Sequence, residues 1–138
     1  MRAITLTLSL CLVACPSLAE DQFLTFKSPS GNILCSMMGG DEPGVRCDML
    51  SLTQTYTKQP VGCEFEWGHS FYVGAYDAEG ELACVNDAIG AKAHTPVLPY
   101  DARLDYAGIT CLSERAGVTC GNEEGHGFSL SKAEQQLY

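Results

Sequence analysis

Basic residues are scarce in this sequence. Only 8 of its 138 residues are Lys or Arg, against 17 Asp and Glu, which gives a formal net charge of −9. Binding to nucleic acids and to anionic membranes depends on Lys and Arg, so the composition argues against both kinds of partner. The excess of acid would either steer the chain toward a basic partner or simply keep a small exported protein soluble.

Sequence motifs for catalysis and metal binding are missing as well. No Gly-x-Ser-x-Gly elbow marks a nucleophilic serine, and no Cys-x-x-Cys or His-x-x-x-His spacing marks a structural metal site. The three histidines, His69, His94 and His126, are far apart in the sequence, so a shared metal site would depend on the fold. We therefore expect no metal, no cofactor and no enzymatic activity.

Long apolar runs are missing after the start of the chain. There, a largely apolar segment from Ala3 to Ala14 follows Arg2 and precedes small and then acidic residues. This order is typical of a secretory signal peptide, which we place at residues 1–19, and the apolar segment is too short to span a bilayer. The remaining residues, 20–138, predict no transmembrane segment and have the size of one domain, either periplasmic or secreted.

Two processing sites compete in this leader. Ser17-Leu18-Ala19 suits the ordinary signal peptidase and predicts cleavage after Ala19. Leu12-Val13-Ala14-Cys15 resembles a bacterial lipobox instead, which would leave Cys15 as a lipid-anchored first residue. Cleavage after Ala19 is our main expectation, because Pro16 directly follows the cysteine and this is unusual in a lipoprotein.

Six cysteines follow the leader, and an even number in an exported chain indicates disulfide bonds. They are Cys35, Cys47, Cys63, Cys84, Cys111 and Cys120. Over residues 33–49, apolar and polar side chains alternate on both sides of a turn-forming segment. Folding the chain about Asp41 sets Cys35 opposite Cys47, close enough for a disulfide.

Residues 109–122 repeat this arrangement. Folding the chain about Arg115-Ala116 sets Cys111 opposite Cys120, so we predict a second hairpin with its own bridge. Both hairpins contain Ile-x-Cys followed by Gly-Val-x-Cys. This similarity indicates either an internal duplication or the pattern that any cystine hairpin would have.

A third hairpin fits residues 71–85, with a turn at residues 77–80. Its register places five side chains on one face, those of Phe71, Val73, Ala75, Leu82 and Cys84. Cys84 is then left to pair with Cys63 by elimination.

These elements predict an all-β fold, a small disulfide-stapled antiparallel β domain of about three hairpins with a short C-terminal helix. Ser131-Lys132-Ala133-Glu134 is a capping box and predicts the helix over residues 132–138. Residues 86–108 contain several Pro and Gly and should be irregular, apart from a short extended run from Thr95 to Leu98. Leu50 to Thr57 could hold a turn or two of helix.

Five strings of residues span most of the chain after the leader. They are Phe26-Lys27-Ser28-Pro29-Ser30-Gly31-Asn32-Ile33-Leu34-Cys35, Val45-Arg46-Cys47-Asp48, Leu98-Pro99-Tyr100, Gly117-Val118-Thr119-Cys120 and Gly125-His126-Gly127-Phe128-Ser129-Leu130-Ser131. In combination they resemble a family of small exported bacterial proteins of unknown function. The resemblance implies export, a disulfide-bonded β domain and no known chemistry. The chain differs from the family at two places. It has Asn86-Asp87-Ala88 where members of the family have a segment similar to Gly-Asp-Thr, and it has Asp101 where they usually have Gly.

Two glycine-containing turns are candidate contact sites. Glycines on both sides of His126 let the backbone take positive φ and would expose the imidazole to a ligand. Alternatively His126 caps a tight turn through a local hydrogen bond. Residues 28–32 are typical of a turn in which Asn32 caps its own backbone, with a binding loop as the alternative.

Acidic and aromatic residues are interleaved around the third hairpin. The acids are Glu64, Glu66, Asp77, Glu79 and Glu81, and the aromatics are Trp67, Tyr72 and Tyr76. Tyr72 and Tyr76 should point away from the core, which is typical of an interaction surface and also of a solvated outer sheet face. Our candidate binding residues are therefore His126, Trp67, Tyr72 and Tyr76.

The sequence thus predicts a non-enzymatic envelope or secreted binding module. Its partner would be a basic envelope or secreted protein, such as a cell-wall hydrolase, rather than a nucleic acid. The alternative is an envelope-glycan hydrolase that uses Glu64, Glu66 or Asp77 with assistance from His126. This alternative requires two of the carboxylates to converge in one cleft.

Overall fold

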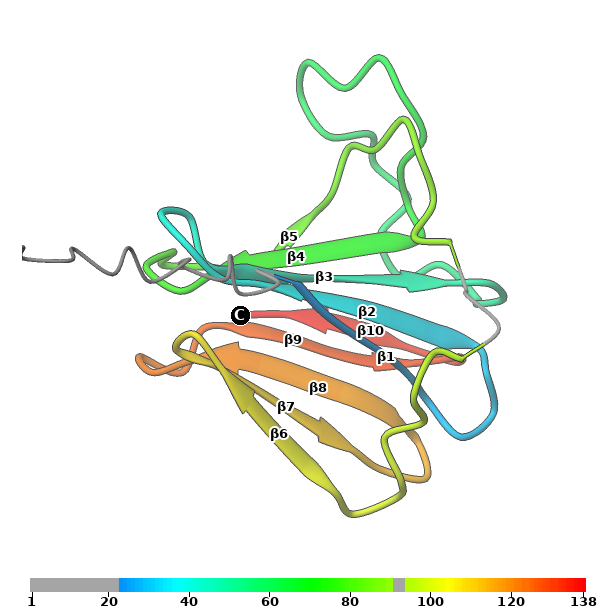
Figure 1. The fold of residues 1–138 in the computed structure, drawn as a ribbon. Helices are drawn as coiled ribbons and strands as arrows, with labels where there is room; N and C mark the ends of the chain where they lie inside the picture. Colours follow the sequence, from blue (N-terminus) through cyan, green and yellow to red (C-terminus); the bar gives the residue numbers. More distant parts are fainter. Residues whose placement is uncertain (1–22, 91–93) are drawn as a thin grey trace, which may run out of the picture.

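The computed structural model describes residues 23–90 and 94–138. The expected signal peptide, the cleavage after Ala19 and the lipid anchor at Cys15 all lie outside the described residues. Within these residues the fold is all-β, with no helix, and two five-stranded antiparallel sheets share one hydrophobic core (Figure 1). This part of the chain therefore also contains no helix that could cross a membrane.

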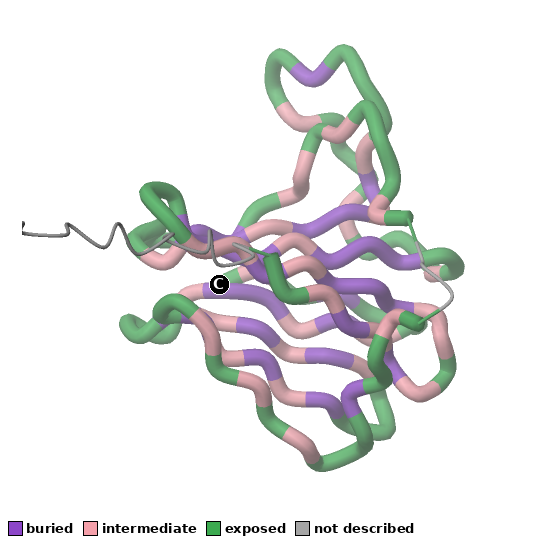
Figure 2. The backbone as a smooth tube through the Cα atoms, in the orientation of Figure 1, coloured by how far each residue is buried: buried purple, intermediate pink, exposed green. Residues whose placement is uncertain are grey.

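Each sheet is a meander, in which every strand pairs with the next one along the chain. The first sheet contains β1 (Phe23–Lys27), β2 (Ile33–Met38), β3 (Gly44–Met49), β4 (Ser70–Gly74) and β5 (Glu81–Leu82). The second contains β6 (Arg103–Tyr106), β7 (Ile109–Ser113), β8 (Gly117–Asn122), β9 (Gly127–Ser131) and β10 (Gln135–Leu137). Buried positions alternate with partly exposed ones along most strands, so one face of each sheet lines the core (Figure 2).

The three predicted disulfides are all present. Cys35–Cys47 joins opposed residues of β2 and β3, and Cys111–Cys120 joins opposed residues of β7 and β8, in the predicted registers. These four cysteines are fully buried. The third bridge, Cys63–Cys84, ties the chain before β4 to the chain after β5; we expected Cys84 on the core face, but it lies beyond β5 and is exposed.

The predicted C-terminal helix is wrong, because residues 135–137 form β10 instead. The local contact expected of the capping box is present: the Ser131 hydroxyl accepts a hydrogen bond from the Glu134 N–H at 3.1 Å. That contact also closes a tight turn, since the Ser131 N–H donates back to the Glu134 carbonyl. The unpaired edge of β9 then takes up the following residues as a strand.

The fold contains more strands than the three predicted hairpins would supply. The region 86–108, expected to be irregular, contains the strand β6, whose four residues are too few for their alternation of polar and apolar side chains to indicate a strand. Leu50 to Thr57, where a turn or two of helix could have formed, contains no helix. The extended run from Thr95 to Leu98 is real: Val97 bridges Lys27 of β1 in parallel. The chain between β5 and β6 therefore passes along the outer edge of the first sheet.

The repeat between the two cystine hairpins extends to all five strands. One row of directly opposed residues crosses each sheet, Phe26–Cys35–Cys47–Phe71–Leu82 in the first and Leu104–Cys111–Cys120–Phe128–Leu137 in the second. The rows match in residue type at four of the five positions and in apolar character at the fifth. This correspondence favours duplication of a five-stranded unit over the general resemblance of cystine hairpins.

Equivalent residues of the two rows meet in the core. The Sγ atoms of Cys47 and Cys120 lie 3.9 Å apart, and the ring centroids of Phe71 and Phe128 lie 6.3 Å apart. Contacts between equivalent residues are what a two-fold relation between two similar units produces. The sheets therefore pack on each other as the two halves of a symmetric dimer would.

The connection between β3 and β4 breaks this symmetry. It spans residues 50–69, whereas its counterpart between β8 and β9 spans only residues 123–126, and it rises above the sheets in Figure 1. Its first part covers the edge of the second sheet: the Gln135 N–H donates to the Thr55 hydroxyl and the Leu137 N–H to the Tyr56 hydroxyl. The excursion thus protects the edge strand β10 from pairing with another chain.

A partly buried ion pair lies on the outer face of the first sheet. The Arg46 guanidinium donates two hydrogen bonds to the Asp48 carboxylate, both 2.8 Å long, and a third to the Asp87 carbonyl. The Asp48 carboxylate also accepts from the Ile89 N–H at 2.7 Å, and Asp48 is only 5% exposed. This clasp holds residues 87–89 over the sheet through backbone groups.

Asp101 lies in the left-handed region, with φ of 66°. Side chains with a β-carbon rarely adopt this conformation, and glycine adopts it without steric cost. The resemblance stated above places Gly at this position, and the backbone geometry supplies the physical reason.

The clasp predicts a contrast between two Arg-x-Asp pairs of equal spacing. Asp48→Asn should lower the free energy of unfolding by about 2–3 kcal/mol, because Arg46 loses a buried carboxylate partner. Asp105→Asn should change it little, because Arg103 and Asp105 on β6 are both exposed. Chemical denaturation of the protein with intact disulfides measures both, and equal losses would contradict the role given to the clasp.

Candidate functional site

Tyr72 lies on the outer face of β4, opposite the buried side chains of Phe71 and Val73. Burial raises the pKa of the Tyr72 phenol above its ordinary value, and nearby carboxylates raise it further. Those carboxylates belong to Asp77, Glu81 and Glu42. Asp77 of the turn after β4, Glu81 of β5 and Glu42 of the β2–β3 turn therefore place one phenol in a negative field.

The backbone explains why these groups gather. The Tyr72 ring lies over Gly44 of β3, so close that a β-carbon there would sit 2.6 Å from the phenol oxygen. Asp77 is held in the turn after β4, where its carboxylate accepts from the Gly74 N–H at 2.7 Å. Tyr76 in the same turn is 85% exposed. We call this surface the acidic tyrosine face and define it as Glu42, Tyr72, Tyr76, Asp77, Glu79 and Glu81.

His126 lies in the turn between β8 and β9, beside the turn that carries Tyr76. Asn122 joins the two turns, because its side-chain N–H groups donate to the carbonyls of Gly74 and Asp77. The Asn122 side-chain oxygen accepts from the His126 N–H at 3.1 Å. The turn cap is therefore Asn122 rather than His126, whose hydrogen bonds in the described part of the chain come from its backbone.

The two glycines beside His126 are required for different structural reasons. Gly125 has a φ of 86°, as the sequence predicts for a turn. At Gly127 the backbone of β9 approaches β8, and a β-carbon would lie 2.0 Å from the Cys120 carbonyl oxygen. Gly127 is thus required by packing between strands rather than by exposure of the imidazole.

The four candidate binding residues do not form one site. Tyr72 and Tyr76 belong to the acidic tyrosine face, and the turn of His126 adjoins it. Trp67 is half-buried and precedes β4, near the Cys63–Cys84 bridge, so the whole of β4 separates it from Tyr76. Five residues of strand span roughly 17 Å.

The carboxylates of the hydrolase alternative are also separated. Glu64 and Glu66 lie before β4 and Asp77 lies after it, and all three are exposed. A glycosidase needs two carboxyl groups that face each other across one sugar, about 5–10 Å apart. β4 separates Asp77 from Glu64 and Glu66, so Asp77 does not form such a pair with either glutamate.

Sequence reasoning missed a cavity at the opposite end of the sandwich. Its volume is about 320 Å³, and two cations, Arg115 and Lys132, line it together with Ser30 and Tyr100. Three of the five strings that carry the family resemblance contribute lining residues, at positions 28–33, 100 and 117. The two cations are isolated in the sequence, so no local pattern could have paired them.

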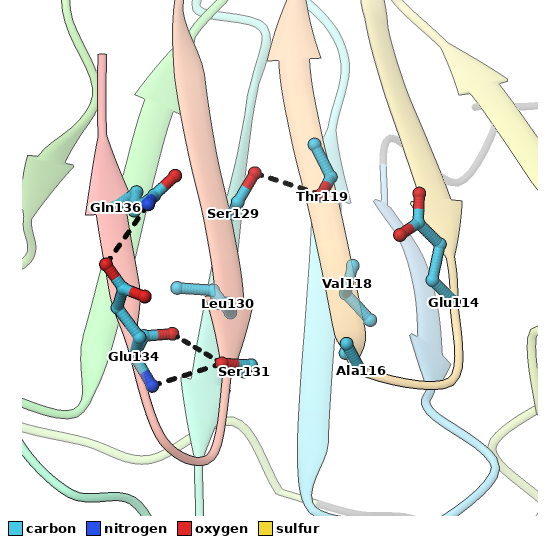
Figure 3. Close-up of a pocket in the computed structure, with 10 residues that line it drawn as sticks. Glu114, Ala116, Val118, Thr119, Ser129, Leu130, Ser131, Glu134 and Gln136 are labelled. Carbon is cyan, nitrogen blue, oxygen red and sulfur yellow. Dashed lines mark hydrogen bonds between the residues drawn. The ribbon is translucent and has the colours of Figure 1, made fainter.

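A second cavity of about 230 Å³ adjoins it on the second sheet, and Figure 3 shows its lining. Glu114 and Glu134 stand on opposite sides, with Thr119 and Ser129 between them (Figure 3). The Thr119 and Ser129 hydroxyls are hydrogen-bonded to each other at 3.0 Å, and Glu134 accepts from Gln136. The side chains of Thr119, Ser129 and Glu134 in this cavity already have partners within the protein.

Comparison with known proteins identifies the family of the chain but assigns no activity to it. A model of a family of unknown function, DUF6636, matches residues 5–138. The chain belongs to this family, as the resemblance predicts. No curated protein and no solved structure is significantly similar to the chain.

Asn122 and His126 should differ in their effect on stability. Asn122→Ala should lower the free energy of unfolding by about 2–3 kcal/mol, because an 8% exposed amide loses four hydrogen bonds. His126→Ala should change it little, because the backbone of His126 keeps its bonds. Denaturant unfolding measures both, and a larger loss for His126→Ala would contradict the assignment of the cap.

The raised pKa of Tyr72 predicts how the ionisation of this residue and the stability of the fold depend on pH. The folded chain holds the phenol proton more tightly than the unfolded chain, so Tyr72 should ionise at a higher pH than an ordinary tyrosine, about 10. Its contribution to stability is complete below that ordinary value and is lost as pH rises through the folded pKa.

Absorbance or NMR titration of the tyrosinates checks this prediction, and Tyr72→Phe identifies the Tyr72 step. Asp77→Asn and Glu81→Gln should each move that step to lower pH, because each removes a negative charge acting on the phenol. Glu64→Gln changes the net charge equally but lies in another connection, so it serves as the control. An equal shift in the control would refute a local field at Tyr72.

Proposed function

We propose that this member of a family without an assigned activity is a non-enzymatic binding protein of the envelope or the secreted medium. It recognises a basic protein partner through the acidic tyrosine face. The observation that carries the proposal is the gathering of Asp77, Glu81 and Glu42 around the half-buried phenol of Tyr72, whose pKa burial and these carboxylates raise.

The chemistry of this face suits Lys and Arg side chains. Carboxylates attract the cationic group, and tyrosine rings add cation–π attraction and apolar area around it. Tyr76, at 85% exposure, is an aromatic group that a partner can cover. The net charge of −9 extends the attraction beyond the contact itself and favours encounter with a basic protein.

A stiff scaffold supports a binding role. The acidic tyrosine face is built on β4 and on turns that hydrogen bonds from Asn122 and Asp77 hold in place. Groups that are already ordered lose little conformational entropy when a partner binds. The same rigidity would favour recognition of one surface of a partner.

Two observations support the non-enzymatic part of the proposal. All six cysteines of the described residues are in disulfides, so none of them offers a thiolate nucleophile. Asp77, one of the carboxylates of the hydrolase alternative, is separated from Glu64 and Glu66 by the length of β4. Export is supported by the three disulfides, which persist in oxidising compartments, and by the leader sequence.

Affinity capture from envelope extract at low and high salt tests the proposal. The wild-type protein should retain basic proteins at low salt and release most of them at high salt, because screening weakens exposed charge pairs. The variant Asp77→Asn/Glu81→Gln should retain at least about fivefold less. The matched control, Glu64→Gln/Glu134→Gln, has the same net charge and should retain as much as the wild type.

Retention that does not weaken with salt would refute the electrostatic basis of the proposal. Equal losses in the two double variants would show that net charge, and not the acidic tyrosine face, attracts the partner. A further variant, Tyr76→Ser, tests the aromatic part: it should reduce capture without lowering the unfolding temperature, because Tyr76 is exposed.

A further inference from the structure

Three connections meet at the end of the sandwich opposite the acidic tyrosine face. The β1–β2 loop comes from the first sheet, and the β7–β8 and β9–β10 turns come from the second, all at one end in Figure 1. With Tyr100 of the β5–β6 connection, they enclose the cavity of about 320 Å³ described above. Its size is that of a site for a small molecule.

The cavity gathers positive charge in an acidic protein. Both ion pairs within the described residues involve other cations, Arg46 and Arg103. Arg115 and Lys132 form no ion pair there, although the chain has 17 acids. Both line the cavity, whose lining contains a single carboxylate, that of Glu114.

An aromatic contact positions one of these cations. The Arg115 guanidinium carbon lies 5.2 Å from the centroid of the Tyr100 ring, which is a cation–π contact. A cation–π contact uses the charge of the guanidinium rather than its N–H groups as specific donors, so these remain able to donate to an acceptor. Tyr100 is 40% exposed and also lines the cavity.

A chain of hydroxyl groups ends at the cavity. The Ser28 hydroxyl oxygen accepts from the Ile33 N–H at 3.1 Å and lies 3.2 Å from the Ser30 hydroxyl oxygen. In this pair either hydroxyl can donate to the other, and both Ser28 and Ser30 line the cavity.

The Ser30 side chain is exposed and lines the cavity. Its oxygen accepts a hydrogen bond from the Asn32 N–H at 3.2 Å. The Asn32 side chain is engaged elsewhere, in a reciprocal pair of bonds with the Ser51 backbone rather than with its own. The Ser30 O–H can therefore donate to an acceptor bound in the cavity.

We propose that this cavity binds the oxyanion of a small ligand, a carboxylate or a phosphate. Arg115 and Lys132 supply the positive charge, and the Ser30 hydroxyl donates to the bound oxygen. Tyr100 packs against the part of the ligand next to the anionic group. The Glu114 carboxylate repels the anion and so lowers the affinity of the site. The site is independent of the acidic tyrosine face, because it has the opposite charge and lies at the other end of the sheets.

NMR titration of the isotope-labelled protein tests the site. N-acetylalanine and inorganic phosphate are the probes, and N-acetylalanine amide, which lacks the charge, is the control ligand. A saturable shift of the Ser30, Gly31 and Gly117 amide signals by an anionic probe, but not by the amide, is the expected result. Binding of N-acetylalanine identifies carboxylate as the source of the oxyanion, and binding of phosphate alone identifies phosphate.

Variants separate a built site from general charge attraction. Arg115→Gln and Lys132→Gln should each weaken binding about fivefold or more, and the double variant should abolish it. Lys27→Gln/Lys58→Gln removes the same charge outside the cavity and should leave binding within about twofold. Glu114→Gln should tighten binding about threefold, whereas Glu64→Gln should not change it.

Ser30→Ala should weaken binding about fivefold or more, because it removes the hydroxyl donor. An unfolding curve of this variant establishes that it is folded at the titration temperature. Three outcomes would overturn the proposal. They are no saturable shift of these amide signals with either anion, equal shifts with N-acetylalanine amide, or equal losses of binding in Arg115→Gln/Lys132→Gln and in Lys27→Gln/Lys58→Gln.

Discussion

The Sγ atoms of Cys47 and Cys120 meet 3.9 Å apart at the centre of the molecule, each within a disulfide that joins two neighbouring strands. Each bridge keeps its hairpin in one register, and a slip of one residue would turn every core side chain outward. Phe71 and Phe128 flank the contact from the next strands. The packing of the two sheets, and so the position of every loop at their ends, depends on this contact.

Duplicated sheets give the molecule two ends with different connections. At one end, Glu42 and Asp77 gather around the phenol of Tyr72. At the other, Arg115 and Lys132 line one cavity. Separation by the length of the strands, together with screening by salt, keeps these fields from cancelling. One small domain can therefore present two oppositely charged surfaces, and the proposals for them can fail separately.

Several strings that identify the family have structural roles in this chain. Val45-Arg46-Cys47-Asp48 combines a core disulfide with the partly buried clasp over the outer face of the first sheet. In the last string, Gly127 allows β9 to approach β8. The string from Phe26 to Cys35 differs, because it also supplies Ser30, an exposed hydroxyl that lines the basic cavity. Packing accounts for the first two.

The sequence by itself determined the β class and the two cystine hairpins with their registers, because alternation and turn residues act between neighbours along the chain. The third bridge, Cys63–Cys84, followed only by elimination. Tertiary structure decided what followed Ser131: the turn contact is the same in a helix and a hairpin, and the free edge of β9 selected the strand. It also decided the cap at Asn122, which reaches the turn after β4 from a distant strand. The basic cavity joins residues from four connections, and only the packing of two sheets brings such connections together.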